Sequence, residues 1–301
     1  MRRIFELSVL CVAAGIVSAC KPSEVISSPT PPTAGVRFIN AVPDTSGGGG
    51  LDLRFVDLVE NSAAFGITFR NNPLTASGVT ASSLIQYKAA QAGARHFRIF
   101  LNDTIQTVAQ TVLKDSTANL EAGHNYTFLL WGNARTGSGV GKMELKVLDE
   151  NVADPGSNVA LRVINTTGSA IDVSYYNQGS TVPTTPAWAN VGAYSISSYK
   201  TVSPNKIMFH VTPAGGTTTL FSDALAIVGE PVGTSTNGCT VGVDCDVTPG
   251  TTVPGSAVTL IVFPASVTGA KTPQTTAFKV PASSFMWDRR PPKSCTVSFG
   301  C

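Results

Sequence analysis

Short apolar segments separated by Gly, Pro, Asn and Ser recur along most of the chain. Residues 95–101 (RHFRIFL) place three apolar side chains on one face, and residues 206–211 (KIMFHV) show a similar pattern. A two-residue period is typical of a strand with one buried face. Residues 105–120 are the one stretch compatible with either a helix or a strand. The pattern therefore predicts an all-β chain whose short strands form sandwiches.

The strand pattern occurs twice. Residues 36–40 (VRFIN) correspond to residues 161–165 (LRVIN), and residues 127–131 (TFLLW) correspond to residues 259–263 (TLIVF). This self-similarity indicates two copies of one unit that differ by loop insertions. Further corresponding positions are residues 51–55 with 171–175, Tyr87 with Tyr199, Lys88 with Lys200, and Asp149 with Asp288.

A turn-rich segment at residues 154–157 (DPGS) separates the two copies, and each copy is long enough to bury its own core. The sequence thus predicts a chain of five parts. They are a signal peptide (1–19), a lipidated cysteine with a Pro/Ser/Thr-rich tether (20–35), a first β-sandwich repeat (36–153), a second β-sandwich repeat (157–292) with an insertion (229–256), and a cysteine-containing tail (293–301).

The N-terminus has the features of an export signal. Arg2 and Arg3 precede an apolar run at residues 7–17, and small residues follow it. This order is typical of a secretory signal peptide. The run is too short for a membrane-spanning helix, which needs about 20 residues.

Residues 17–20 (VSAC) resemble the lipobox of bacterial lipoproteins. The resemblance implies that Cys20 is acylated and that the chain is cleaved before it, so that acyl chains anchor the protein to a membrane. A plain signal peptide with an incidental cysteine is the alternative. Lys21 stands where an Asp favours retention in the inner membrane, so the resemblance implies an outer-membrane location, facing either the periplasm or the surface.

Composition narrows the class of protein. Apolar residues make up 43% of the chain, which argues against disorder. Charged residues make up only 13%, and the net charge is +2. This balance lacks the basic surface that nucleic-acid binding requires. The expected partners are the membrane, through the lipid, and either an envelope polysaccharide or another surface protein.

The start of the first repeat is similar to a known family. Residues 37–44 (RFINAVPD), followed by residues 51–53 (LDL), resemble the opening motif of domain-of-unknown-function family 4397 (DUF4397). The resemblance extends over residues 35–290 and is weaker in the second copy, where residues 166–169 (TTGS) replace the Pro-Asp turn. It implies secreted or lipid-anchored bacterial proteins with tandem immunoglobulin-like domains, and it implies no established activity.

Four further cysteines form two pairs of equal spacing. In an oxidising compartment they predict disulfides rather than a zinc site, because zinc ligands are usually separated by two to four residues. Three disulfide connectivities are possible for four cysteines. The sequence favours the one in which each bond joins the two cysteines of a local pair, without excluding the other two. The four residues are Cys239, Cys245, Cys295 and Cys301.

Two aspartates, Asp52 and Asp172, stand at corresponding strand positions. They could form a carboxylate-centred ligand site in each repeat. The favoured interpretation is structural, with Asp52 paired to Arg37 and Asp172 paired to Arg162 across neighbouring strands.

Candidate chemistry is sparse. Trp131, Trp188 and Trp287 are candidate sugar-stacking residues, although core packing is the commoner role of strand-end aromatics. No metal-binding motif, no nucleophile elbow and no cofactor fingerprint occurs in the sequence, so neither a metal nor a cofactor is expected. The three histidines, His96, His124 and His210, are expected to be ordinary strand or turn residues.

Together these features predict a lipid-anchored cell-envelope protein with a non-catalytic role in adhesion, scaffolding or binding. One alternative is a carbohydrate-binding module that uses exposed tryptophans. Another is a hydrolase whose site brings scattered residues together, with a histidine beside a carboxylate in a deep pocket.

Overall fold

The structure is a computed structural model that describes residues 31–45, 50–58, 68–71, 87–135, 142–230, 247–270, 272 and 274–291. Residues 32–301 group into one compact unit. The lipidation site Cys20 and the four cysteines of the expected disulfides lie outside the described residues. Within the described part of the chain, no helix is long and apolar enough to cross a membrane.

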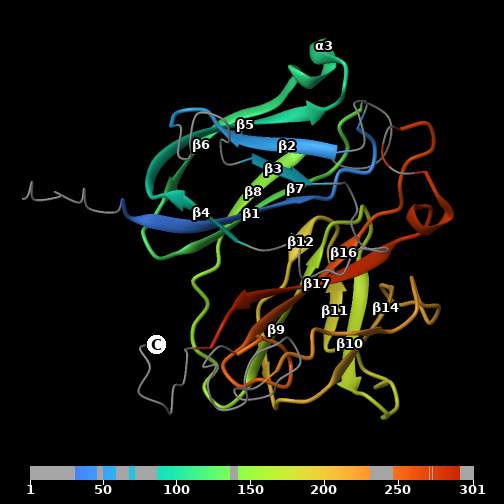
Figure 1. Cartoon of the computed structure of the whole chain (residues 1–301). Coiled ribbons are helices and arrows are strands. Elements are labelled where there is room, and N and C mark those ends of the chain that lie inside the picture. Colours follow the sequence, from blue (N-terminus) through green and yellow to red (C-terminus); the bar gives the residue numbers. More distant parts are fainter. Residues whose placement is uncertain are drawn as a thin grey trace, which may run out of the picture. The chain divides into compact units, whose positions relative to one another are not determined.

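Two four-stranded sheets form the first sandwich (Figure 1). The first inner sheet has the order β4–β1–β7–β8, and the first outer sheet has the order β3–β2–β5–β6. β1 and β7 run parallel, whereas the other neighbours are antiparallel. The strands are β1 (Thr33–Asn40), β2 (Gly50–Phe55), β3 (Thr68–Asn71), β4 (Lys88–Gln91), β5 (Gly93–Asn102), β6 (Val112–Leu120), β7 (Asn125–Trp131) and β8 (Glu144–Asp149).

The second sandwich has the same arrangement of sheets. The second inner sheet has the order β12–β9–β16–β17, with β13 also paired to β9, and the second outer sheet has the order β11–β10–β14–β15. Its one parallel pair, β9 with β16, corresponds to β1 with β7. The strands are β9 (Val159–Asn165), β10 (Ile171–Asn177), β11 (Trp188–Val191), β12 (Ser195–Ile196), β13 (Lys200–Val202), β14 (Ile207–Pro213), β15 (Ala224–Leu225), β16 (Ala257–Phe263) and β17 (Ala282–Arg289).

These sheets confirm the predicted all-β sandwich fold, and the residue bounds assigned to the two repeats remain predictions. The ambiguous stretch at 105–120 contains both kinds of element. It begins with the short helix α3 (Gln106–Ala109) and continues as β6. A 3₁₀ turn, η1 (Thr276–Phe278), precedes β17.

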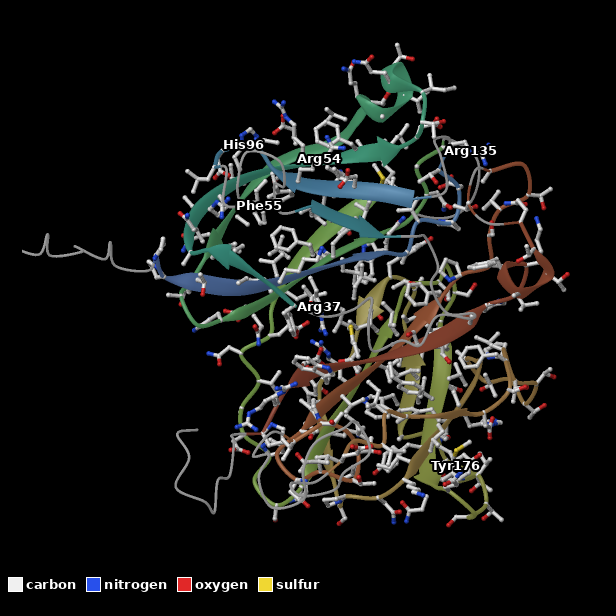
Figure 2. All side chains as sticks on the ribbon, viewed as in Figure 1. Arg37, Arg54, Phe55, His96, Arg135 and Tyr176 are labelled. Atoms are coloured by element: carbon white, nitrogen blue, oxygen red, sulfur yellow. The ribbon has the colours of Figure 1, made fainter. Side chains whose placement is uncertain are left out.

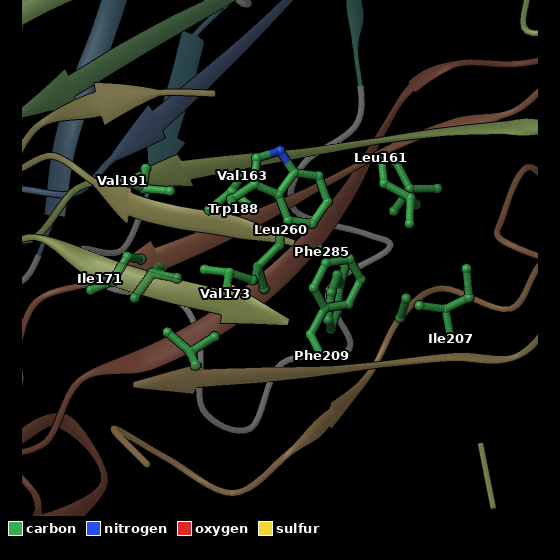
Figure 3. Close-up of a cluster of buried hydrophobic side chains, with 14 of the residues drawn as sticks. Leu161, Val163, Ile171, Val173, Trp188, Val191, Ile207, Phe209, Leu260 and Phe285 are labelled. Carbon is green, nitrogen blue, oxygen red and sulfur yellow. The ribbon is translucent and has the colours of Figure 1, made fainter. Parts of the chain in front are cut away.

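Each sandwich encloses its own apolar core. In the first, Phe97 of β5 packs edge-on against Phe128 of β7, with ring centroids 4.9 Å apart. In the second, Trp188 of β11 lies parallel to Phe209 of β14, with centroids 6.3 Å apart, among the branched side chains shown in Figure 3. Because the alternate positions of each strand face these cores, the two-residue period of the sequence is explained.

A third apolar cluster joins the two inner sheets. It combines residues of β1 and β7 with residues of β9, β16 and β17. The strands β7, β9 and β16 are consequently buried on both faces. A strand buried on both faces reads as a continuous apolar run, which accounts for TFLLW and TLIVF. The cluster consists of Ile39, Ala41, Leu129, Trp131, Ile164, Ile261, Phe263 and Met286.

Candidate functional site: a buried ion cluster beside a cavity

Two arginines occupy corresponding positions on the faces by which the inner sheets meet. Arg37 lies on β1 and Arg162 on β9, and they are 1% and 6% exposed. The Nε of Arg37 donates to the hydroxyl of Thr127 at 2.8 Å, and the Nε of Arg162 donates to the hydroxyl of Thr259 at 2.9 Å. Both arginines are therefore held by a threonine on the parallel neighbouring strand.

A tyrosine ring lies against each guanidinium. The Cζ of Arg37 is 4.5 Å from the centroid of the Tyr87 ring, and the Cζ of Arg162 is 4.6 Å from that of Tyr199. Such stacking stabilises a desolvated cation through the negative face of the ring. Each copy of the repeat thus supplies one set of Arg, Thr and Tyr.

Two carboxylates neutralise the two guanidinium groups. The Nη2 of Arg162 lies 3.0 Å from both carboxylate oxygens of Glu150 and 3.2 Å from Asp288. The Nη2 of Arg37 contacts Asp288 and lies 3.5 Å from Glu150. The hydroxyls of Tyr199 and Thr259 also donate to Asp288. We call Arg37, Arg162, Glu150 and Asp288 the ion cluster.

The electrostatics of the ion cluster favour the charged forms. Burial alone raises the pKa of a carboxyl group, but the charges of Arg162 and Arg37 outweigh this effect and lower the pKa of Asp288. Burial also raises the pKa of the Tyr199 phenol well above its ordinary value, so it stays a hydrogen-bond donor to Asp288. The cluster is electrically balanced, with two cations and two anions.

A cavity of about 360 Å³ opens beside the ion cluster. The segment that follows β8, residues 149–155, forms one wall, and Ala160, Arg162, Tyr199 and Thr201 line the remainder. The cavity therefore reaches from solvent to a buried charge, which makes it the candidate binding site of the described part of the chain.

The two arginines differ in the hydrogen bonding of Nη1. The Nη1 of Arg37 donates to the backbone carbonyl of Trp287 at 2.8 Å. Among the residues that the structure describes, the Nη1 of Arg162 has no acceptor, because the contacts of this side chain are made by Nε and Nη2. Arg162 is also the arginine that lines the cavity.

The predicted Asp–Arg pairs across neighbouring strands are wrong. Asp52 is paired with Arg54 on its own strand, at 2.6 Å, and Asp172 accepts backbone hydrogen bonds from Asn190 and Gly215. The reason is topological. β1 and β2 belong to different sheets, as do β9 and β10, so Arg37 faces the other sandwich instead (Figure 2).

The expectation of exposed tryptophans also needs correction. Trp131 and Trp188 are 2% and 6% exposed, and both belong to apolar clusters, so neither offers a free ring face. Trp287 is half-buried on β17, where it packs edge-on against Tyr87 with ring centroids 5.5 Å apart and lies under Arg290. The structure thus gives these residues the packing role that the sequence analysis identified as the commoner one.

Each histidine lies beside a carboxylate. His96 contacts Asp115, and the Nδ1 of His210 is 2.7 Å from Asp223. The Nδ1 of His124 is 2.9 Å from Asp149, and this hydrogen bond raises the pKa of His124. Asp149 lines the cavity, so this is the histidine–carboxylate pair nearest to the candidate site.

Sequence reasoning did not identify the ion cluster as a site. The signal was present in the repeats, since the arginines, tyrosines and threonines of the two sets occupy corresponding positions of the two copies. The predicted correspondence of Asp149 with Asp288 is off by one residue. Thr127 lies opposite Leu148, and Thr259 lies opposite Met286, so the counterpart of Asp288 is Glu150. Its role depends on the path of the chain after β8.

Comparison with known proteins gives one family match. The model of the family described as domain of unknown function (DUF4397) matches residues 51–176. The matched segment begins in β2 and ends in β10, so it includes Glu150 and Arg162. No curated protein matches the chain.

Among solved structures, the chain is similar to a crystal structure from Bacteroides eggerthii DSM 20697 described as a candidate cell adhesion protein. The two share 9% identity with a TM-score of 0.18, and the match covers 87% of this chain and 97% of that one.

Proposed function

Because the model of the DUF4397 family matches residues 51–176, we propose that this protein is an exported, lipid-anchored component of the bacterial cell envelope. Its two sandwiches have a non-catalytic role in adhesion, scaffolding or binding. The family description supplies no activity, so the proposal rests on the residues of this chain.

The observation that carries the proposal is the way in which the two sandwiches meet. The ion cluster and the third apolar cluster bury charge and hydrophobic surface between the inner sheets. Well-packed interiors resist deformation, so the wall of the cavity that contains Arg162 is held in place. A preformed site on a stiff body loses little entropy on binding, which suits a surface-displayed binding protein.

The tether that follows Cys20 suits a protein that presents its binding site away from the membrane. Residues 21–35 contain several prolines and few charges, and Pro-rich linkers are extended and semi-rigid. Acyl chains on Cys20 would hold this tether at the membrane, since each buried CH₂ contributes about 0.8 kcal/mol.

Replacement of the lipidated residue tests the anchor. We expect Cys20→Ala to move the protein from the membrane fraction to the soluble envelope fraction and to abolish labelling by radioactive palmitate. The matched control is Cys11→Ala, which lies in the segment predicted to be removed and should leave both properties unchanged. An unacylated N-terminal peptide in the wild-type protein, found by mass spectrometry, would refute the anchor.

A further inference from the structure

We propose that the cavity along residues 149–155 binds one neutral sugar residue, held between the guanidinium of Arg162 and the carboxylates of Asp149 and Asp154. This inference rests on the proposed binding role and does not depend on the lipid anchor. It also moves the expected polysaccharide contact away from the tryptophans, which are engaged in packing.

The size of the cavity suits a small ligand. Its volume of about 360 Å³ lies in the range of small-molecule sites, which is roughly 300–1,000 Å³. Val152, Pro155 and Ala160 give it apolar wall surface. A sugar ring has an apolar C–H face that can pack on such a wall while its hydroxyls reach the polar groups.

Arg162 supplies a buried donor for the ligand. Glu150 receives two hydrogen bonds from Nη2 and Thr259 receives one from Nε, so the guanidinium is held in one orientation. Its Nη1 has no acceptor in the described part of the chain. The Arg162 side chain is only 7% exposed, yet its Nη1 is not among the fully buried polar atoms that lack a partner, so solvent reaches it from the cavity. A ligand hydroxyl can therefore accept this hydrogen bond in place of water.

Two carboxylates supply acceptors at the rim. Asp149 is held by His124, and the carboxylate of Asp154 lies 2.8 Å from Arg289. Their side chains are 43% and 54% exposed, and each carboxylate can accept several hydrogen bonds. Both can therefore accept from ligand hydroxyls without losing their present partners.

The charges that line the cavity select a neutral ligand. Each carboxylate of the cavity wall already has a cationic or histidine partner, since Glu150 pairs with Arg162, Asp149 with His124 and Asp154 with Arg289. A charged ligand therefore meets no unpaired counter-charge. A hydroxyl both donates and accepts, so it satisfies the carboxylates and the guanidinium together.

Ligand-observed NMR on the full mature chain in detergent tests the site. The probes are methyl glucoside, methyl galactoside, methyl mannoside and N-acetylglucosamine, with glucuronate and inorganic phosphate as anionic comparators. We expect saturation transfer to at least one neutral sugar and weaker transfer to both anions. Loss of one hydrogen-bond acceptor in Asp154→Ala should weaken the affinity about tenfold.

A blocking variant separates this site from any other sugar contact. Thr201 is exposed on β13 and lines the cavity, so Thr201→Trp should fill it and remove the signal. Thr117→Trp, at an exposed position on β6, is the matched control and should keep the signal. The sugar site is refuted if no neutral sugar gives a signal, if Thr201→Trp binds as well as the wild type, or if glucuronate binds more strongly. None of these results bears on the membrane fractionation of Cys20→Ala.

Discussion

The negative charge of Asp57 stabilises the first sandwich. Burial raises the pKa of its carboxyl group, but hydrogen bonds from the Arg95 side chain and the His96 backbone outweigh this and lower the pKa to about 2. The Nε and Nη2 of Arg95 lie 3.0 and 3.1 Å from the carboxylate oxygens. Arg95 itself is fully buried, and its guanidinium stacks over the ring of Phe55, which is labelled in Figure 2.

The pH dependence of this contribution has a definite sign. A carboxyl group whose pKa is lowered on folding stabilises the protein above its ordinary pKa of 3.8, and the contribution disappears as the pH falls through 2. We expect Asp57→Asn to lower the free energy of unfolding by about 1 kcal/mol at pH 7, because solvent screens the charge of this exposed residue. The deficit relative to the wild type should shrink between pH 4 and pH 2. Urea unfolding followed by circular dichroism at several pH values measures it.

A second aspartate serves as the control. Asp103 accepts a backbone hydrogen bond from Ile105, and Asp103→Asn should change the free energy of unfolding by less than about 0.5 kcal/mol. A deficit in Asp57→Asn that is equally large at pH 2 and pH 7 would show that the charge of Asp57 is not its source.

Single residues also show where sequence reasoning ends. The correspondence of Arg37 with Arg162 could be read from the repeats, but their partners could not. Glu150 and Asp288 approach the arginines through the packing of two inner sheets, and no local pattern encodes that packing. The same limit applies to Asp52, which is paired with Arg54 two residues away on its own strand.

At the level of the elements, the strands β7 and β16 determine how the sandwiches combine. Alternate residues of β7 face the core of the first sandwich, and the residues between them face the second sandwich. Both strands were predictable from their apolar runs. Their burial on both faces was not inferred, although the absence of alternation in these two runs is the signal that a second layer covers them.

Leu129 of β7 tests this double burial. It is fully buried and belongs to the third apolar cluster, outside the core of its own sandwich. We expect Leu129→Ala to lower the free energy of unfolding by about 2–5 kcal/mol, the range for a buried leucine. The control is Leu225→Ala on β15, where the side chain is 40% exposed, and it should change stability much less. Equal effects of the two substitutions in urea unfolding would contradict the packing of the inner sheets.

At the scale of the whole molecule, the ion cluster lies between two sandwiches of the same topology. Desolvating four charges is unfavourable, and removal of one partner from a buried pair typically destabilises a protein by about 3–5 kcal/mol. The cluster thus penalises any state in which the inner sheets separate only partly. The sandwiches should therefore separate and unfold together rather than one after the other.

Two sandwiches that unfold together would also keep the cavity intact up to global unfolding. Its wall at residues 149–155 comes from the segment between them, whereas Arg162 and Thr201 come from the second sandwich. A site built in this way exists only while both parts are folded.

Hydrogen exchange with mass spectrometry in increasing urea is the most direct measurement of this coupling. Peptides from β5 report on the first sandwich, and peptides from β14 report on the second. We expect the most protected amides of both strands to lose protection at the same urea concentration and with the same dependence on urea, as in one cooperative opening. Loss of protection in one strand at a urea concentration where the other remains protected would contradict the account.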